Sequence, residues 1–219
     1  MAGPAADLAD SKAAIFGLAP IALLMIAAGT FVLLFLMTGS VLIPIKAIVL
    51  NVLSLGATFG AMVWVFQEGN GAGLLDFTAT GTLDTTMPIL MFCIAFGLSM
   101  DYEVFLLSRI KEEHDRTGDT TQAVAIGLQK TGRIMTAAAG VLAVTFIAFS
   151  TSQVTFIKLF GVGLTIAIVM DATLVRGVLV PALMRLAGEA NWWAPPFLRR
   201  VHRRFGLSEG PAPTAPADH

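Results

Sequence analysis

Five long apolar segments limit what this chain can fold into more than any other feature. A hydrocarbon core about 30 Å thick needs roughly 20 helical residues at about 1.5 Å each, and these segments approach or exceed that length. They cover residues 15–37, 41–66, 86–108, 134–151 and 156–186. Because 56% of the residues are hydrophobic and only 13% are charged, the sequence predicts an all-α integral membrane protein.

The expected architecture is a bundle of five transmembrane helices over residues 14–187. A polar stub, residues 1–13, precedes the bundle, and a basic, proline-rich and partly disordered tail, residues 188–219, follows it. Asp119, with a glutamine three residues later, is typical of a helix N-terminus. A short amphipathic cytoplasmic helix is therefore expected in the connection formed by residues 109–133.

Basic residues set the expected orientation. Lys and Arg cluster in the connection of residues 109–133 and in the tail, whereas the loop of residues 67–85 has none. The positive-inside rule then places the connection and the C-terminus in the cytoplasm. Five spans put the N-terminus outside, which suggests that upstream sequence is missing.

Several functional classes receive no support from the motifs. The net charge of -1 gives no sign of a nucleic-acid partner, and the single cysteine, Cys93, argues against a disulfide or a thiolate metal site. The sequence lacks a phosphate-binding glycine loop, an HExxH pair and a GxSxG elbow. We therefore expect no enzyme, no metal site and no cofactor.

A carboxylate interrupts the third apolar segment. Asp101 lies eight residues, or about 12 Å, before Arg109, and a charge at such a depth is costly and usually functional. Burial raises a carboxyl pKa, so a group of this kind can exchange protons near neutral pH. Tyr102, the only tyrosine, can hydrogen-bond a carboxylate. The alternative is that Asp101 only holds helices together.

Other polar residues in the spans support a relay less directly. Glu103 lies about 200° around the helix from Asp101, and pairing with Arg109 or contact with water is an alternative to a direct role. Asp171 and Arg176 are candidates for relay or ion-pair support, although about 140° separates them on a regular α-helix, so they are not expected to pair fully with each other. Neutral groups that suit a proton or water path include Thr136 and Asn51.

Small residues in the spans favour close helix packing over ligand binding. The pattern Gly56-x-x-x-Gly60 and the pair Gly161 and Gly163 are the clearest cases. We expect them to lie where two helices touch.

The sequence resembles the MmpL family of the resistance-nodulation-division (RND) superfamily. The residues that carry this resemblance are GLSMDYEVFLLSRIKEEHDRTG, RIMTAAAGVLAVTFIAFS and VMDATLVRGVLVPALM. Such proteins have two halves, and this chain is similar to the last five helices of the second half, the C-terminal transmembrane half. The resemblance implies that Asp101 and Tyr102 form a proton-relay pair, and that Asp171 and Arg176 belong to a motif of the last helix.

The resemblance also implies what is missing. The chain lacks the first helix of its half, the extracytoplasmic domain and the opposing half with the second Asp-Tyr pair. It is expected to be a fragment, or alternatively a subunit that assembles with an RND-type chain carrying the missing parts.

The implied function is the proton-relay portion of an exporter of lipids or hydrophobic compounds, driven by the proton-motive force in a bacterial plasma (inner) membrane. The expected coupling ion is the proton, and the expected partners are the bilayer, hydrophobic or lipid cargo and the missing half. The alternative is a non-transporting membrane module that binds lipid or scaffolds a partner.

Overall fold

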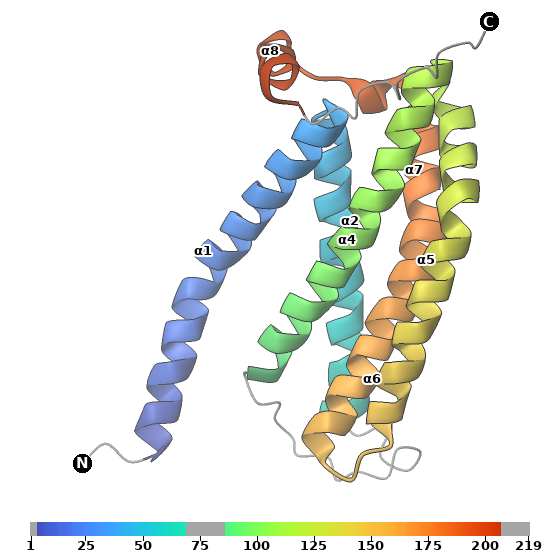
Figure 1. Cartoon of the computed structure of the whole chain (residues 1–219). Coiled ribbons are helices and arrows are strands. Elements are labelled where there is room, and N and C mark those ends of the chain that lie inside the picture. The colour runs from blue at the N-terminus through green and yellow to red at the C-terminus, as the bar shows by residue number, and fades with distance from the viewer. Residues whose placement is uncertain (1–3, 69–85, 207–219) are drawn as a thin grey trace, which may run out of the picture.

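The chain forms a bundle of long helices, seen here in a computed structural model that describes residues 4–68 and 86–206 (Figure 1). In chain order the elements are α1 (Pro4–Thr38), α2 (Leu42–Met62), the π-helix η1 (Val63–Gln67), α4 (Thr86–Thr117), α5 (Thr120–Ser150), α6 (Thr155–Met170), the π-helix η2 (Asp171–Leu179), α7 (Val180–Ala187), the 3-10 helix η3 (Gly188–Trp192) and α8 (Pro196–Phe205). No strand occurs in the described ranges, and the predicted all-α class is confirmed.

Five helical stretches of the described chain are long and apolar enough to cross a membrane, as predicted. They cover Gly17–Thr38, Leu42–Gln67, Pro88–Thr117, Thr120–Ser150 and Thr155–Trp192. The first of them, α1, meets the bundle near its C-terminal end and leans away from it toward its N-terminus (Figure 1). Parts of the predicted stub and tail, residues 1–3 and 207–219, and the loop of residues 69–85 lie outside the described residues.

The amphipathic helix predicted between the third and fourth spans is continuous with the fourth span. Asp119 caps α5 as expected, and its side chain accepts hydrogen bonds from the amides of Thr121 (2.8 Å) and Gln122 (3.2 Å). The apolar strip of this stretch packs on α4, with Ala123 fully buried and Gly127 against Ile110. This packing holds the strip in line with the rest of α5. The separate short amphipathic helix is α8, in the basic tail.

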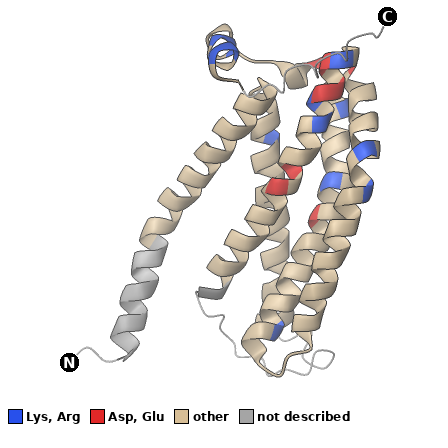
Figure 2. Ribbon diagram, viewed as in Figure 1, with Lys and Arg blue, Asp and Glu red and all other residues tan. Residues whose placement is uncertain are grey.

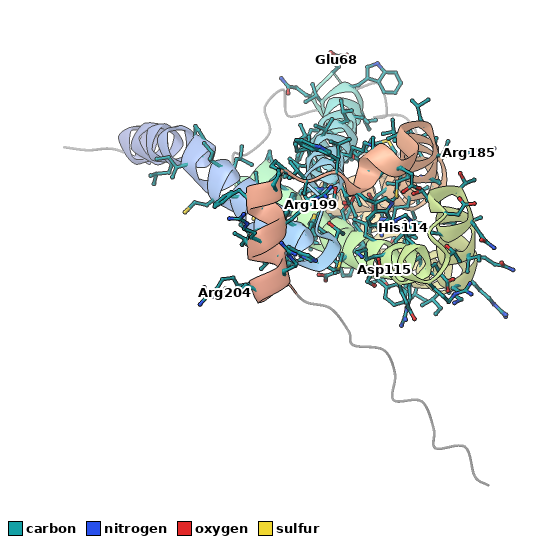
Figure 3. All side chains as sticks on the ribbon, turned by 90° about the horizontal axis from the view of Figure 1, so that it is seen from above. Glu68, His114, Asp115, Arg185, Arg199 and Arg204 are labelled. Carbon is teal, nitrogen blue, oxygen red and sulfur yellow. The ribbon has the colours of Figure 1, made fainter. Side chains whose placement is uncertain are left out.

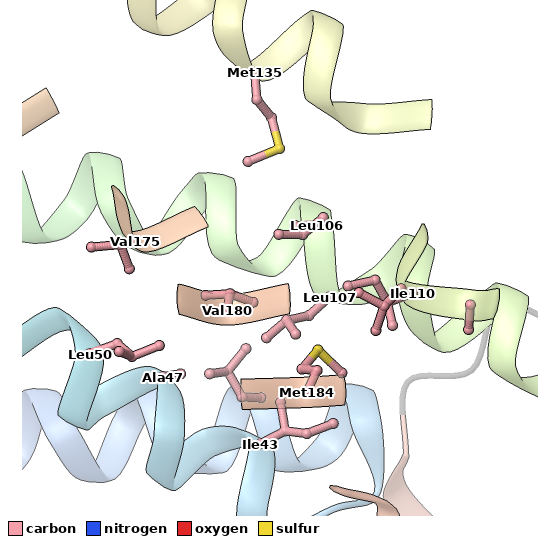
Figure 4. Packing of buried hydrophobic residues seen from close by; sticks show 13 residues of the cluster. Ile43, Ala47, Leu50, Leu106, Leu107, Ile110, Met135, Val175, Val180 and Met184 are labelled. Carbon is pink, nitrogen blue, oxygen red and sulfur yellow. The ribbon is translucent and has the colours of Figure 1, made fainter. Parts of the chain in front are cut away.

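The apolar core lies where α2, α4, η2 and α7 meet (Figure 4). Leu50 of α2, Leu107 of α4 and Val180 and Met184 of α7 are all at least nine-tenths buried in it. In contrast, large apolar side chains such as Leu24, Val52 and Val141 are more than 60% exposed. Such a surface is suited to lipid rather than to water.

Charged residues gather toward the end of the bundle that holds α8 (Figure 2). There Glu113 of α4 accepts hydrogen bonds from Arg116 (2.8 Å) and from Lys130 of α5. Trp192 of η3 donates its indole N–H to Thr120 Oγ1 at 2.9 Å. These contacts join the ends of α4, α5 and the last span.

Small residues decide how closely α5 and α6 approach. A Cβ added at Gly161 would lie 2.6 Å from the carbonyl oxygen of Phe146 and 2.7 Å from the amide nitrogen of Ser150, both backbone atoms. A Cβ at Gly163 would collide with the side chain of Met91 on α4, so the packing role predicted for Gly161 and Gly163 is confirmed. For Gly56 and Gly60 it is wrong within the described residues, because nothing lies within 4 Å of a Cβ at either position.

We expect Gly161→Ala to destabilise the bundle by about 1–3 kcal/mol, because the backbone of α5 must move to admit the methyl group. Gly140→Ala in α5 is the matched control, because a Cβ at that position has nothing within 4 Å. Helix propensity alone should then stabilise this variant by about 1 kcal/mol. Reversible unfolding of the purified chain in detergent measures both. Equal effects of the two variants would contradict the close approach.

Candidate functional site

A buried ion network joins α4 to η2 within the membrane-spanning part of the bundle. Asp171 and Arg176 of η2 are 8% and 3% exposed and form an ion pair. Ser99 of α4 donates its hydroxyl to Asp171 Oδ1 at 2.8 Å, and Arg176 donates to the backbone oxygen of Ser99. Each charged group thus has a partner, as buried charges require.

The pairing of Asp171 with Arg176 differs from the prediction for a regular α-helix. The segment Asp171–Leu179 is a π-helix, in which hydrogen bonds join residues five apart. Positions i and i+5 therefore stack on one side of the helix rather than about 140° apart. The wider turn is what allows two residues at this spacing to form a buried pair.

Glu103 belongs to the same buried region. It is 6% exposed, so it does not reach bulk water, and it lies within electrostatic range of Arg176 and Asp171. Arg109, suggested as its partner, instead makes a 2.6 Å ion pair with Glu112.

A cavity of about 20 Å³ beside Glu103 is also lined by Lys46 of α2. This volume admits about one water molecule. Lys46 Nζ donates to Asn191 Oδ1 at 2.7 Å and to the backbone oxygen of Leu183 at 3.2 Å. A single enclosed water molecule therefore fits beside Glu103, although the side chain is closed to bulk solvent.

Tyr102 and Asp101 lie at the edge of this network. The guanidinium carbon of Arg176 is 4.8 Å from the centre of the Tyr102 ring, which is partly buried. Asp101 is exposed on the outside of the bundle, on a different face of α4 from the buried Glu103. Tyr102 thus connects the buried ions to the neighbourhood of the exposed carboxylate.

The remaining predicted residues are not part of these contacts. Thr136 is exposed on α5. Asn51 is 2% exposed, and its amide nitrogen and oxygen have no hydrogen-bond partner within the described part of the chain. Over the same residues, no three His, Cys, Asp or Glu side chains come together as metal ligands.

Sequence reasoning missed two members of the site, Ser99 and Lys46. Ser99 precedes Glu103 by four residues, so both lie on one face of α4, and this spacing is a usable signal. Lys46 is a lone cation inside the second apolar segment, which is also a signal of function in a span.

Five apolar spans with an ion network buried among them define a multi-pass membrane protein. The chain belongs to the MMPL family, whose model matches residues 1–214, and the predicted family is confirmed. It is a family of membrane transporters rather than of enzymes.

Three relatives show how far the similarity extends. The chain is 50% identical over 217 residues to a membrane protein of Streptomyces coelicolor, covering 98% of this chain and 31% of that protein. It is 43% identical over 204 residues to the trehalose monomycolate exporter MmpL3 of Mycolicibacterium smegmatis, covering 93% of this chain and 20% of MmpL3. It is 39% identical over 199 residues to the heme uptake protein MmpL11 of Mycobacterium tuberculosis, covering 91% and 20%. The chain therefore spans a fifth to a third of their length.

We expect Arg176→Met to destabilise the bundle by about 3 kcal/mol, because Asp171 would remain buried without its partner. The double variant Asp171→Leu/Arg176→Met should recover most of that loss, since it removes both charges. Unfolding of the purified chain in detergent measures the two variants. Arg109→Gln is the control, because its pair with Glu112 is exposed and worth at most about 1 kcal/mol. A double variant as unstable as the single one would contradict the pairing.

Proposed function

We propose that this chain forms the transmembrane proton-relay part of an exporter of lipids or hydrophobic compounds that is driven by the proton-motive force. Asp101 is the proposed proton-binding group. The observation that carries this proposal is the exposure of Asp101 on the outside of α4, about 12 Å along the helix from Arg109. An ionised carboxylate facing lipid at this depth is costly, so the surface around Asp101 is suited to a protein partner or a water-filled path.

The buried network offers a route from Asp101 to the rest of the bundle. Tyr102 follows Asp101 in the chain, and its ring packs against Arg176. A change of charge at Asp101 alters the field at Arg176, which pairs with Asp171 and holds the backbone of Ser99. Protonation of Asp101 can thereby favour one arrangement of α4 and η2 over another.

The available energy suits such a switch. A proton gradient of about 180 mV is worth roughly 4 kcal/mol per proton, at about 2.3 kcal/mol per 100 mV. A difference of that size changes a two-state equilibrium by about a thousandfold. One carboxylate cycling between its charged and neutral forms is therefore sufficient to bias the bundle.

The expected partner is an opposing transmembrane half with its own Asp-Tyr pair, in the same bacterial inner membrane. The exposed faces of α4 and α5, which carry Asp101 and Thr136, are the proposed contact surface. The basic residues at the end that holds α8 support the proposal that this end, and the C-terminus, face the cytoplasm. Asn51, buried and unpartnered over the described residues, is a proposed site for a water molecule of the relay.

The class of cargo comes from the relatives by similarity. One exports trehalose monomycolate and another takes up heme, and both are bulky, amphipathic or hydrophobic molecules. The alternative function, a non-transporting module that binds lipid or scaffolds a partner, predicts lipid binding that varies neither with pH nor with loss of Asp101.

We expect Asp101→Asn, in a complete transporter that carries this sequence, to abolish transport, because the amide cannot exchange a proton. The same change should leave the stability of the bundle within about 0.5 kcal/mol, since Asp101 is exposed in the chain. Proton-driven cargo export from cells or proteoliposomes measures the first effect, and unfolding measures the second. Glu112→Gln, on the same helix but at its charged end, is the control. Undiminished export by Asp101→Asn would overturn the relay.

Two substitutions at Tyr102 distinguish the role of its hydroxyl group from the role of its ring. Tyr102→Phe keeps the ring beside Arg176, so it should lower transport while leaving stability nearly unchanged. Tyr102→Ala also removes the cation–π contact and the packing, and we expect it to destabilise the bundle by about 2 kcal/mol. Equal stability losses in the two variants would show that the hydroxyl, and not the ring, holds the network.

A further inference from the structure

A basic cleft opens where α1, α4 and α8 meet, at the charged end of the bundle and apart from the buried network. Its volume is about 570 Å³. Its charged wall comes from Lys111 of α4 and from Arg199, Arg200 and Arg203 of α8, with Asp115 as the one carboxylate among its lining residues. Four cations against one carboxylate give the cleft a formal charge of +3 with neutral histidines.

Over the residues that the structure describes, the arginines of the cleft have no protein counter-charge. Lys111 pairs with Asp115, which accounts for the carboxylate. Arg199, Arg200 and Arg203 are exposed, and none of their guanidinium groups makes a hydrogen bond or an ion pair within the part of the chain that the structure describes. An anion is therefore the ligand class that the cleft is suited to bind.

The wall formed by α8 is held in place by one histidine. The His202 ring lies edge-on to Phe35 of α1, with 6.0 Å between ring centroids and an angle of 70°. It also covers Gly39, whose φ of 69° ends α1, and a Cβ there would lie 2.9 Å from the ring. The contact fixes α8 across the end of α1, and Figure 3 shows this arrangement from above.

Stacked aromatic rings form the floor of the cleft. Trp192 stacks on His114 with 4.1 Å between ring centroids and an interplanar angle of 10°. Lys111 Nζ lies 5.5 Å from the centre of the Trp192 ring. Lys111 thus lies against packed aromatic rings, and the arginines of the cleft belong to a helix that packs on α1.

The level of the cleft relative to the membrane identifies the source of the anion. Thr38, which lines the cleft, is also the last residue of the apolar span of α1. In and next to α8, which carries the arginines, the aromatic side chains of Trp193, Phe197 and Phe205 are 52%, 71% and 63% exposed. Exposed aromatic rings next to arginines at the end of a span are typical of the headgroup region.

We propose that this cleft binds the phosphodiester headgroup of an anionic glycerophospholipid, with Arg199, Arg200 and Arg203 as its ligands and the acyl chains alongside α1. Basic pockets at the membrane surface recognise such headgroups. The apolar side chains on α8, Phe197 and Phe205 among them, would lie in the same leaflet. This site does not depend on the proposed proton relay.

The test uses the full chain in detergent micelles that hold equal amounts of phosphatidylglycerol and phosphatidylcholine with the same acyl chains. Native mass spectrometry gives the ratio of chain bound to each lipid. We expect a clear preference for phosphatidylglycerol, which Arg199→Gln/Arg203→Gln lowers by about thirtyfold, at roughly 1 kcal/mol per basic side chain. Arg199→Lys/Arg203→Lys should retain most of it.

The matched control is Arg185→Gln/Arg204→Gln, which removes the same charge from outside the cleft lining. In Figure 3, Arg204 lies at the outer end of α8 and Arg185 on the other side of the bundle. We expect this pair to retain the preference within about threefold. An equal loss in both pairs would overturn the site in favour of general surface charge, and so would the absence of a preference in the unchanged chain. Displacement of the lipid by inorganic phosphate would reassign the cleft to a free anion.

Discussion

The buried pair of Asp171 and Arg176 is the constraint on which the transmembrane part of this structure depends. An arginine that is 3% exposed must keep a counter-ion and hydrogen-bond acceptors for its guanidinium group, and here it takes them from η2 and from the backbone of Ser99 on α4. The network therefore fixes the last span against α4, at the depth where apolar packing alone would allow the two helices to slide. The core of Leu50, Leu107 and Val180 lies beside it and supplies the bulk of the packing. Polar contacts set the register, while apolar contacts set the distance.

The π-helix explains why the network is possible at this point of the chain. Residues 171 and 176 would face apart on an α-helix, and the i to i+5 geometry of Asp171–Leu179 brings them together. Single π segments are uncommon and are found frequently at functional sites. A segment of this kind is also a place where hydrogen bonding can return to the α pattern. On an α-helix the two residues would lie about 140° apart, so the ion pair depends on the π-helical geometry of η2.

Sequence patterns were sufficient for the architecture and for part of the site. Segment length and hydropathy gave the five spans, and Asp119 marked the start of α5, because both depend on local chemistry. The pairing of Asp171 with Arg176 and the burial of Glu103 were not predictable, because each depends on a helix type and on neighbours from other helices. The orientation of Gly56 and Gly60, with nothing near them in the described chain, likewise depends on tertiary packing. Ser99 could have been predicted, because its spacing of four from Glu103 places it on the same buried face of α4.

The two polar regions of the molecule pose opposite problems. The network around Arg176 balances its charges inside the bundle, whereas the cleft beneath α8 leaves three arginines without a protein partner among the described residues. Exposed cations are inexpensive in water, but the docking of His202 on Gly39 holds these at the end of an apolar span, beside exposed aromatic rings. A helix held this way orders its arginines before any ligand arrives, which lowers the entropy lost on binding. An anion drawn from the bilayer completes the charge balance that the chain leaves open at the membrane surface.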